Sequence, residues 1–305
     1  MKLLAKFLLP AGLLFFLLSN AVADISSVRE LFADFQLTPF LIAFSLLLID
    51  YPQGAEGWHI LLGRMGIKMK FKDSLRIWIL STTARYIPGS IWQYVGRIEL
   101  GRKAGIARKD IITSMLAEVF FVLVAGVTMA SLSLLFVDLK DLGVGIWIFF
   151  LPFVFFILHP AISKRIIRLL AKLTNRVDMD LDNELGLGDS LYVLPFYVVN
   201  FLINGTALYF LVLALGIELQ VSQIAAFTGF YAASWVLGYI AVFAPAGVGV
   251  TEITLAGLLS LSMPFSVASA VALSYRFFLT IAEVTVFLLV LNFDGKHTKP
   301  VGEAQ

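Results

Sequence analysis

The chain contains seven long apolar stretches, and their lengths limit what it can fold into. A helix that crosses a bilayer needs about 20 mainly apolar residues. Two shorter apolar stretches, 77–95 and 247–261, contain or directly follow a Pro/Gly break. The sequence therefore predicts an all-α polytopic membrane protein with about 7–8 transmembrane helices and one or two re-entrant segments broken by Pro and Gly. The long stretches cover residues 3–22, 37–62, 111–136, 144–162, 191–215, 221–243 and 267–291.

The composition excludes several other classes of protein. Of the 305 residues, 59% are hydrophobic and 14% are charged, and the mean hydropathy is +0.90. Soluble domains carry about 25% charged residues, so an ordinary cytosolic enzyme, a disordered chain and a nucleic-acid-binding protein are excluded. The chain has no cysteine, which excludes disulfides, thiolate metal sites and cysteine nucleophiles.

Basic residues cluster in three short connections, at 64–76, 97–109 and 164–176. Each connection carries five Lys or Arg residues, and together they hold 15 of the 23 in the chain. The positive-inside rule predicts that these loops are cytoplasmic, in a protein of the cell inner (plasma) membrane. The segment 77–95 joins two of these loops, so we expect it to enter the membrane and return, bending at Pro88-Gly89. A kinked helix on the cytoplasmic surface is the alternative.

We expect a single integral membrane domain over residues 1–305, built from two repeat-like halves. The halves are 1–162 and 191–292, with a charged cytoplasmic loop at 163–190 and a polar tail at 293–305. The first stretch is either a retained helix or a cleaved signal, because it ends in a signal-peptidase-like Ala21-Val22-Ala23. The side of the C-terminus stays open, since 247–261 either crosses or returns.

Ionisable residues inside apolar segments are costly unless they are paired or hydrated, so they are candidate functional residues. Arg276 and Glu283 are seven residues apart and therefore share one face of a helix. One interpretation is buried ion pairs that join Arg85 or Arg276 to Glu118 or Glu283. The other is that the arginines hold a lipid phosphate, for which the planar guanidinium is suited. The full set is Arg85, Glu118, Glu252, Arg276 and Glu283, with Asp50, Glu56 and His59 near the end of the second stretch.

Motifs for other chemistry are absent from the sequence. The three histidines form no metal-binding pair, and no glycine-rich loop precedes a Lys-Ser or Lys-Thr. The acidic residues between 178 and 189 lack the spacing of a calcium loop. We therefore predict no metal, no cofactor, no nucleotide site and no catalytic residue.

Two runs resemble the transmembrane region of lysylphosphatidylglycerol synthases and related stand-alone flippase-like membrane proteins. One is Arg85-Tyr86-Ile87-Pro88-Gly89-Ser90-Ile91-Trp92-Gln93, continuing through Gly96-Arg97, and the other is Phe243-Ala244-Pro245-Ala246-Gly247-Val248-Gly249-Val250-Thr251-Glu252. Gln93 and Ala246 depart from the acidic residue and the glycine common at those positions. The resemblance implies these substrate-binding candidates: Arg85, Pro88, Gly89, Trp92, Gln93, Arg97, Glu118, Pro245, Gly247, Gly249, Glu252, Arg276 and Glu283.

The resemblance implies that the protein translocates or scrambles an anionic or polyprenyl-linked lipid between leaflets, with membrane lipids as its partners. The large aminoacyl-transferase domain of the synthases is not present, so we do not expect lipid aminoacylation. One alternative is a non-transporting membrane subunit or scaffold for a cell-envelope glycosyltransferase or a lipid-modifying enzyme. Another is an intramembrane enzyme that uses Glu252 or Glu283 as a general base.

Overall fold

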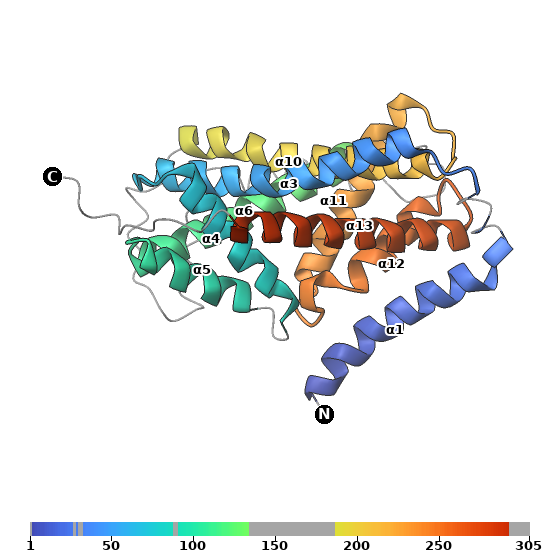
Figure 1. Ribbon diagram of the computed structural model, residues 1–305, viewed down its shortest axis with the longest axis horizontal. Coiled ribbons are helices and arrows are strands. Elements are labelled where there is room, and N and C mark those ends of the chain that lie inside the picture. Colours follow the sequence, from blue (N-terminus) through green and yellow to red (C-terminus); the bar gives the residue numbers. More distant parts are fainter. Residues whose placement is uncertain (1, 27–28, 30–32, 88–90, 134–186, 293–305) are drawn as a thin grey trace.

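The computed structural model describes residues 2–26, 29, 33–87, 91–133 and 187–292, and every regular element among them is helical (Figure 1). This confirms the predicted all-α fold. The predicted crossing at 144–162 and the basic loop at 164–176 lie outside the described residues. The long helices are α1 (Lys2–Ala23), α3 (Leu37–Arg64), α6 (Arg108–Ser133), α10 (Leu187–Ala214) and α13 (Phe265–Asn292). The short ones are α4 (Phe71–Thr82), α5 (Trp92–Lys103), α11 (Ile224–Ile240) and α12 (Val250–Leu259).

Four helices of the described chain are long and apolar enough to cross a membrane, namely α3, α6, α10 and α13. Each has 26 to 28 residues, which corresponds to about 39–42 Å at 1.5 Å per residue. The hydrocarbon core of a bilayer is about 30 Å thick. These helices therefore have the length to span it and to extend into both interfaces. The fold is that of a multi-pass membrane protein.

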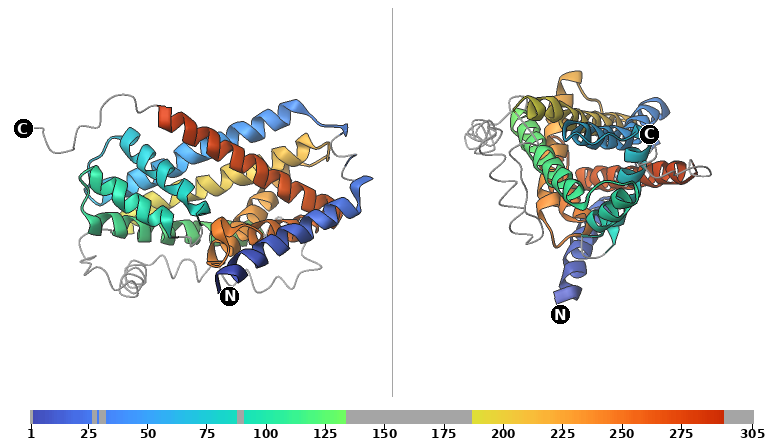
Figure 2. Two further views of the ribbon diagram at one scale, coloured as in Figure 1. Left: turned by 60° about the horizontal axis from the view of Figure 1, so that its bottom comes forward. Right: turned by 90° about the vertical axis from the view of Figure 1, so that its left-hand side faces the viewer.

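The short helices form two hairpins that enter the bundle from opposite ends (Figure 2). Helices α4 and α5 start and finish at the end that carries the basic stretches 64–76 and 97–109, and the 3-10 turn η1 (Thr83–Tyr86) lies at their tip. Helices α11 and α12 enter from the other end and meet at the 3-10 turn η5 (Pro245–Gly247). The two turns are in contact with each other.

The second hairpin resolves the path of the chain through its C-terminal half. Helix α11 has only 17 residues and ends at the inner turn, so it is shorter than the crossing predicted over 221–243. Helix α12 returns to the end from which α11 entered, and α13 then runs back toward the basic end (Figures 1 and 2). Helix α13 therefore ends on the same side of the bundle as α3.

The long helices and hairpins form two sets with the same order and opposite direction. One set is α3, the α4–α5 hairpin and α6, and the other is α10, the α11–α12 hairpin and α13. Helices α3 and α10 have 28 residues each and lie antiparallel. The Arg64–Asp189 ion pair (3.3 Å) joins them at one end. At the other end, the backbone N–H of Gln36 donates to the Ala214 carbonyl (2.8 Å). Inverted sets of this kind are typical of membrane transporters.

Small residues allow these helices to approach closely. A Cβ added to Gly205 on α10 would lie 2.3 Å from the Cα of Thr228 on α11. A Cβ on Gly126 of α6 would lie 2.6 Å from the Val236 side chain of α11. Small residues at helix contacts are a common basis of packing in lipid, where close van der Waals contact replaces much of the hydrophobic driving force. Helix α11 is therefore closely packed between α6 and α10.

Helix α1 covers the second hairpin from outside. It packs along α12 and α13, and Leu17 is fully buried. A Cβ on Gly249, which follows η5, would lie 2.8 Å from the carbonyl oxygen of Pro10. The backbone of α1 therefore lies directly against the start of α12.

Candidate functional site

The contact between the two hairpin turns brings together charges that are far apart in the sequence. Turn η1 holds Arg85 and Tyr86, turn η5 holds Ala246, and Glu252 lies in the first turn of α12. Helix α13 passes both turns and provides Arg276 and Glu283. Together with Tyr51 of α3, these side chains and the Ala246 carbonyl form what we call the central charge cluster.

The first ion pair of this cluster joins the α4–α5 hairpin to α13. Oε2 of Glu283 accepts hydrogen bonds from Arg85 Nη2 (2.6 Å), the Tyr86 hydroxyl (2.7 Å) and the Tyr51 hydroxyl (3.4 Å). Glu283 is 2% exposed. A carboxylate buried this deeply is stable only when it is paired and hydrogen-bonded. The other oxygen, Oε1, has no hydrogen-bond partner within the described part of the chain.

The second ion pair joins α13 to the α11–α12 hairpin. Arg276 Nη1 lies 3.2 Å from Glu252 Oε1, and both terminal nitrogens of Arg276 lie 3.3 Å from the carbonyl oxygen of Ala246, to which they donate. Glu252 Oε2 accepts the backbone N–H of Gly249 at 2.5 Å. Glu252 thus caps the helix that it belongs to, where the positive end of the helix dipole favours a carboxylate.

The irregular backbone at η5 is what presents the Ala246 carbonyl to Arg276. Ala246 has φ 52°, and among the described residues it is the sole non-glycine with positive φ. Gly247 and Gly249 have φ values of +68° and +85°, which glycine adopts without the steric cost of a Cβ. This explains why a glycine is common at the position that Ala246 occupies here.

The two ion pairs meet at one aromatic ring. The Arg85 guanidinium carbon lies 5.3 Å and that of Arg276 5.8 Å from the centroid of the Tyr86 ring. Both distances are within the range of a cation–π attraction. Two cations, one paired through each hairpin, are thereby held around a single side chain at the point where the hairpins touch.

Two other predicted site residues, Arg97 and Glu118, form a separate cluster. They make an ion pair between α5 and α6. Arg97 also donates from Nε to Ser81 Oγ (3.1 Å) and from Nη2 to Thr82 Oγ1 (3.2 Å), and the Trp78 indole donates to Glu118 Oε1 (2.7 Å). The two charges neutralise each other, and most of the N–H donors in this cluster have acceptors. The cluster therefore connects the α4–α5 hairpin to α6.

These contacts correct part of the predicted pairing. The Arg85–Glu283 pair is as predicted, but Arg276 pairs with Glu252, and Glu118 pairs with Arg97. The physical reason is that each partner lies on the hairpin arm packed beside it, which periodicity within one helix does not reveal.

The remaining candidates lie at the hairpin tips. Pro245 and Gly247 form η5, and Gly249 precedes α12. Trp92 begins α5 and is 45% exposed, with Gln93 next to it. Pro88 and Gly89 lie outside the described residues. Within the residues that are described, no group of three His, Cys, Asp or Glu side chains is placed to hold a metal ion.

Sequence reasoning did not select Tyr51, Tyr86 or the Ala246 carbonyl for the site. Tyr86 and Ala246 were inside the two motif runs, next to residues that were selected. Tyr51 directly follows Asp50 in the middle of a predicted crossing, and a tyrosine hydroxyl at that depth requires a partner. This need for a hydrogen-bond partner is the sequence feature that could have identified Tyr51.

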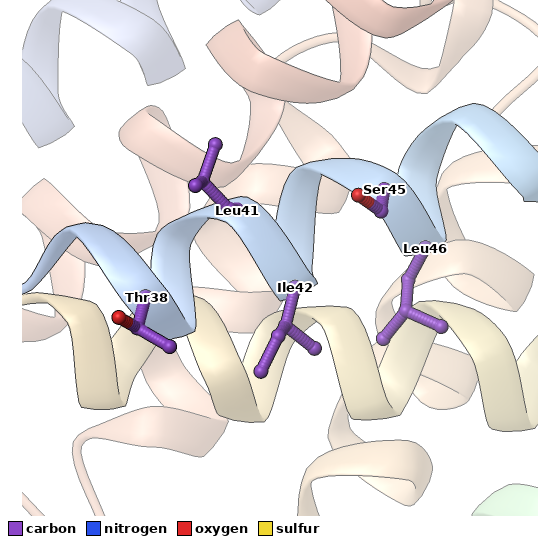
Figure 3. A pocket seen from close by; sticks show the side chains of 5 residues that line it. All are labelled: Thr38, Leu41, Ile42, Ser45 and Leu46. Carbon is purple, nitrogen blue, oxygen red and sulfur yellow. The ribbon is translucent and has the colours of Figure 1, made fainter.

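A shallow groove lies on the outer face of α3, away from these charges. It has a volume of about 370 Å³ and is lined by Thr38, Leu41, Ile42, Ser45 and Leu46. Figure 3 shows Ile42 and Leu46 pointing across α10, while Leu41 points away from it. The groove is apolar apart from two hydroxyls.

Long apolar helices, opposed hairpins and buried arginine–glutamate pairs define a polytopic integral membrane protein built like a transporter. The chain matches the family Lysylphosphatidylglycerol synthase TM region over residues 3–286, and it belongs to this family, as its motifs predicted. A comparison with curated proteins found no match. The matched region is the transmembrane region of those synthases.

Proposed function

We propose that this protein moves an anionic or polyprenyl-linked lipid between the leaflets of the cell inner membrane. The observation that carries the proposal is the meeting of two opposed hairpin tips at a pair of arginines. Sites of this kind, formed by discontinuous helices at the interface of inverted sets, hold substrate in many secondary transporters. The described chain provides no metal cluster, and we propose that it is not an enzyme.

The arginines retain capacity for a phosphate although each is already paired. Their side chains are 25% (Arg85) and 18% (Arg276) exposed, whereas their partners Glu283 and Glu252 are 3% and 2% exposed. An arginine has five N–H donors. Nη2 of Arg85 binds Glu283, and its Nε is buried without a partner among the described residues, so a phosphate would reach the cation through the exposed part of the side chain. A phosphate oxygen can therefore bind the accessible side of the cation while the carboxylate stays behind it.

The surface around the hairpin tips suits the apolar part of a lipid. Large apolar side chains there are strongly exposed, with Ile91 at 57% on one hairpin and Val242 at 73% on the other. Exposed apolar patches on a membrane protein contact lipid chains. In this proposal the head group reaches the arginines while the chains remain outside, along an apolar rim formed by Ile87, Ile91, Trp92, Val95, Ile240, Val242 and Phe243.

The two ion pairs also provide a way for the hairpins to move. Each hairpin is attached to α13 by one arginine–glutamate pair, Arg85–Glu283 or Arg276–Glu252. A bound phosphate competes with the glutamate for the same guanidinium, because both are oxyanions that accept from its fork. Binding therefore weakens the attachment of that hairpin. Alternate release of the two hairpins would open the site to one leaflet and then to the other.

The proposal is tested by leaflet exchange in proteoliposomes that contain the purified protein. Fluorescent phosphatidylglycerol, phosphatidylethanolamine and a polyprenyl-phosphate sugar are each followed by quenching of the outer leaflet. Arg85→Ala and Arg276→Ala should lose exchange, and Arg64→Ala, which removes an exposed arginine at the bundle end, should retain it. Full exchange by both central variants would refute the assigned roles.

The alternative of a non-transporting subunit has a distinct outcome in the same experiment. The wild-type protein would then exchange no lipid and would co-purify with a cell-envelope glycosyltransferase or a lipid-modifying enzyme. The basic ends of α3, α4 and α5 would be the surface for such a partner, because they carry Lys68, Lys70, Arg102 and Lys103 on one side of the bundle.

A further inference from the structure

Asp50 is a partly buried carboxylate that the proposed function has not used. It lies in the middle of α3, 13 residues from the start of the helix. Its Oδ1 accepts from the side-chain amides of Asn200 (2.5 Å) and Asn204 (2.6 Å), both on α10. Within the described residues it makes no ion pair, and its second oxygen has no hydrogen bond. Its hydrogen bonds with the described residues therefore come from neutral amide groups alone.

Among the described residues of the bundle interior, Asp50 is a carboxylate without a matching cation. Each of the three interior arginines is matched with its own glutamate. Asp50 is a further carboxylate, and it forms no ion pair with another described residue. An unpaired charge at this depth is costly in a membrane protein, and the binding of an anionic head group beside it increases that cost. The three matched pairs are Arg85–Glu283, Arg97–Glu118 and Arg276–Glu252.

The fields that act on Asp50 come from the central charge cluster. Arg85 and Glu283 are the charged groups close enough to act on it. The other titratable groups that face it are the hydroxyls of Tyr51 on its own helix, Tyr231 on α11 and Tyr275 on α13. Helix α10 contributes the two asparagines. A charged group that binds at Arg85 therefore changes the electrostatic potential at Asp50, because the dielectric constant of the bundle interior is low.

We propose that Asp50 is a proton-binding site that couples lipid transfer to a proton gradient. The inference rests on the proposed function, since the coupled ligand is the anionic head group at the arginines. When the head group binds, it partly neutralises Arg85 and adds negative charge near Asp50, so Asp50 takes up a proton onto its free oxygen. By linkage, a protonated Asp50 strengthens head-group binding by the same factor. The lipid and the proton then cross together.

The orientation of the amides favours a proton over a metal cation. The Tyr275 hydroxyl donates to Asn204 Oδ1 (2.9 Å), which turns the Asn204 amide nitrogen toward Asp50. Alkali cations bind oxygen ligands, whereas Asp50 is surrounded here by N–H donors. The oxygen of Asn204 that would serve a cation is already occupied.

The test uses the full-length protein in phosphatidylcholine proteoliposomes with fluorescent phosphatidylglycerol. Transfer is measured with and without an imposed pH gradient, and separately with a sodium gradient at equal pH. We expect the pH gradient to accelerate transfer several-fold in the direction of proton flow. Asp50→Asn should transfer at a rate independent of the gradient, and Asp50→Glu should restore part of the dependence. The matched control is Asp189→Asn, which neutralises an acidic residue in the first turn of α10. This variant should behave as wild type.

A second readout keeps this proposal separate from the proposed function. Proton uptake is followed with a pH-indicator dye when protein in nanodiscs is mixed with phosphatidylglycerol. Uptake by the wild type and its loss in Asp50→Asn would support the proton site even if no lipid crossed. Transfer that ignores the pH gradient, transfer that follows the sodium gradient, or proton uptake unchanged in Asp50→Asn would each overturn it.

Discussion

The Arg85–Glu283 pair attaches the first hairpin to α13. Replacing Arg85 with alanine leaves Glu283, which is 2% exposed, without its cation. Breaking a buried pair from one side typically costs about 3–5 kcal/mol, because the remaining charge is uncompensated. The two tyrosine hydroxyls that also donate to Glu283 place the expected loss near the lower end, at about 3 kcal/mol.

Removing both charges should cost less than removing one. In the double variant Arg85→Ala/Glu283→Gln no buried charge remains, and neutral replacements of buried pairs are often close to isoenergetic. We expect each single variant to lose about 3 kcal/mol and the double variant about 1–2 kcal/mol. The coupling energy is then about 4 kcal/mol or more, which is outside the error of a double-mutant cycle.

The free energy of unfolding is measured for the four proteins in lipid bicelles by titration with sodium dodecyl sulfate. The matched control is the exposed pair Arg64–Asp189, whose side chains are 38% and 29% exposed. Its cycle should give less than about 1 kcal/mol of coupling. Additive losses for Arg85 and Glu283, with the double variant equal to the sum, would refute the argument that these two side chains neutralise each other in the bundle.

Three further predictions concern the second cluster and the backbone at η5. Arg97→Ala should destabilise the protein by about 3 kcal/mol or more, and Glu118→Gln in addition should recover part of that loss; thermal unfolding of both variants checks this, and a wild-type Tm for Arg97→Ala would contradict it. Gly249→Ala should cost about 2 kcal/mol, because it combines positive φ with a contact of 2.8 Å to Pro10; unchanged stability in bicelles would argue against the position of α1. Ala246→Gly should raise stability by up to about 1 kcal/mol, since glycine removes the steric cost of φ 52° at some cost in chain entropy; a clear loss would contradict the left-handed conformation.

Much of this fold can be predicted from the sequence, because in lipid each backbone group must be satisfied within its own helix. The predicted stretches 37–62, 191–215 and 267–291 correspond closely to α3, α10 and α13. The break at Pro245 to Gly249 coincides with the tip of the second hairpin, and Pro88-Gly89 follows η1 in the sequence, outside the described residues. A proline removes a helical hydrogen bond wherever it occurs, so these positions are readable without the structure.

The partners of the buried charges were not predictable in the same way. Helical periodicity places Arg276 and Glu283 on one face of α13, and both do face the interior. The carboxylate that pairs with Arg276 depends on where α12 begins relative to η5. The positive φ values at Ala246, Gly247 and Gly249 set that position. The contact between the tips of two opposed hairpins is a tertiary property that no single segment encodes.

Asp50 shows a further limit of the sequence. Its depth in α3 marks it as a costly residue, but its partners Asn200 and Asn204 are 150 or more residues away in the chain. They meet it because α3 and α10 are antiparallel and of equal length, which brings position 14 of one helix beside position 14 of the other. An asparagine in an apolar helix gives no hint of that register by itself.

The central claim is that two arginines at the meeting point of the hairpins select an anionic head group for transfer. It is tested most directly by leaflet exchange of fluorescent phosphatidylglycerol and phosphatidylcholine, measured with the wild-type protein in the same proteoliposomes. The account predicts protein-dependent exchange of phosphatidylglycerol that is clearly faster than that of phosphatidylcholine. Equal rates for the two lipids, or no protein-dependent exchange of either, would contradict it.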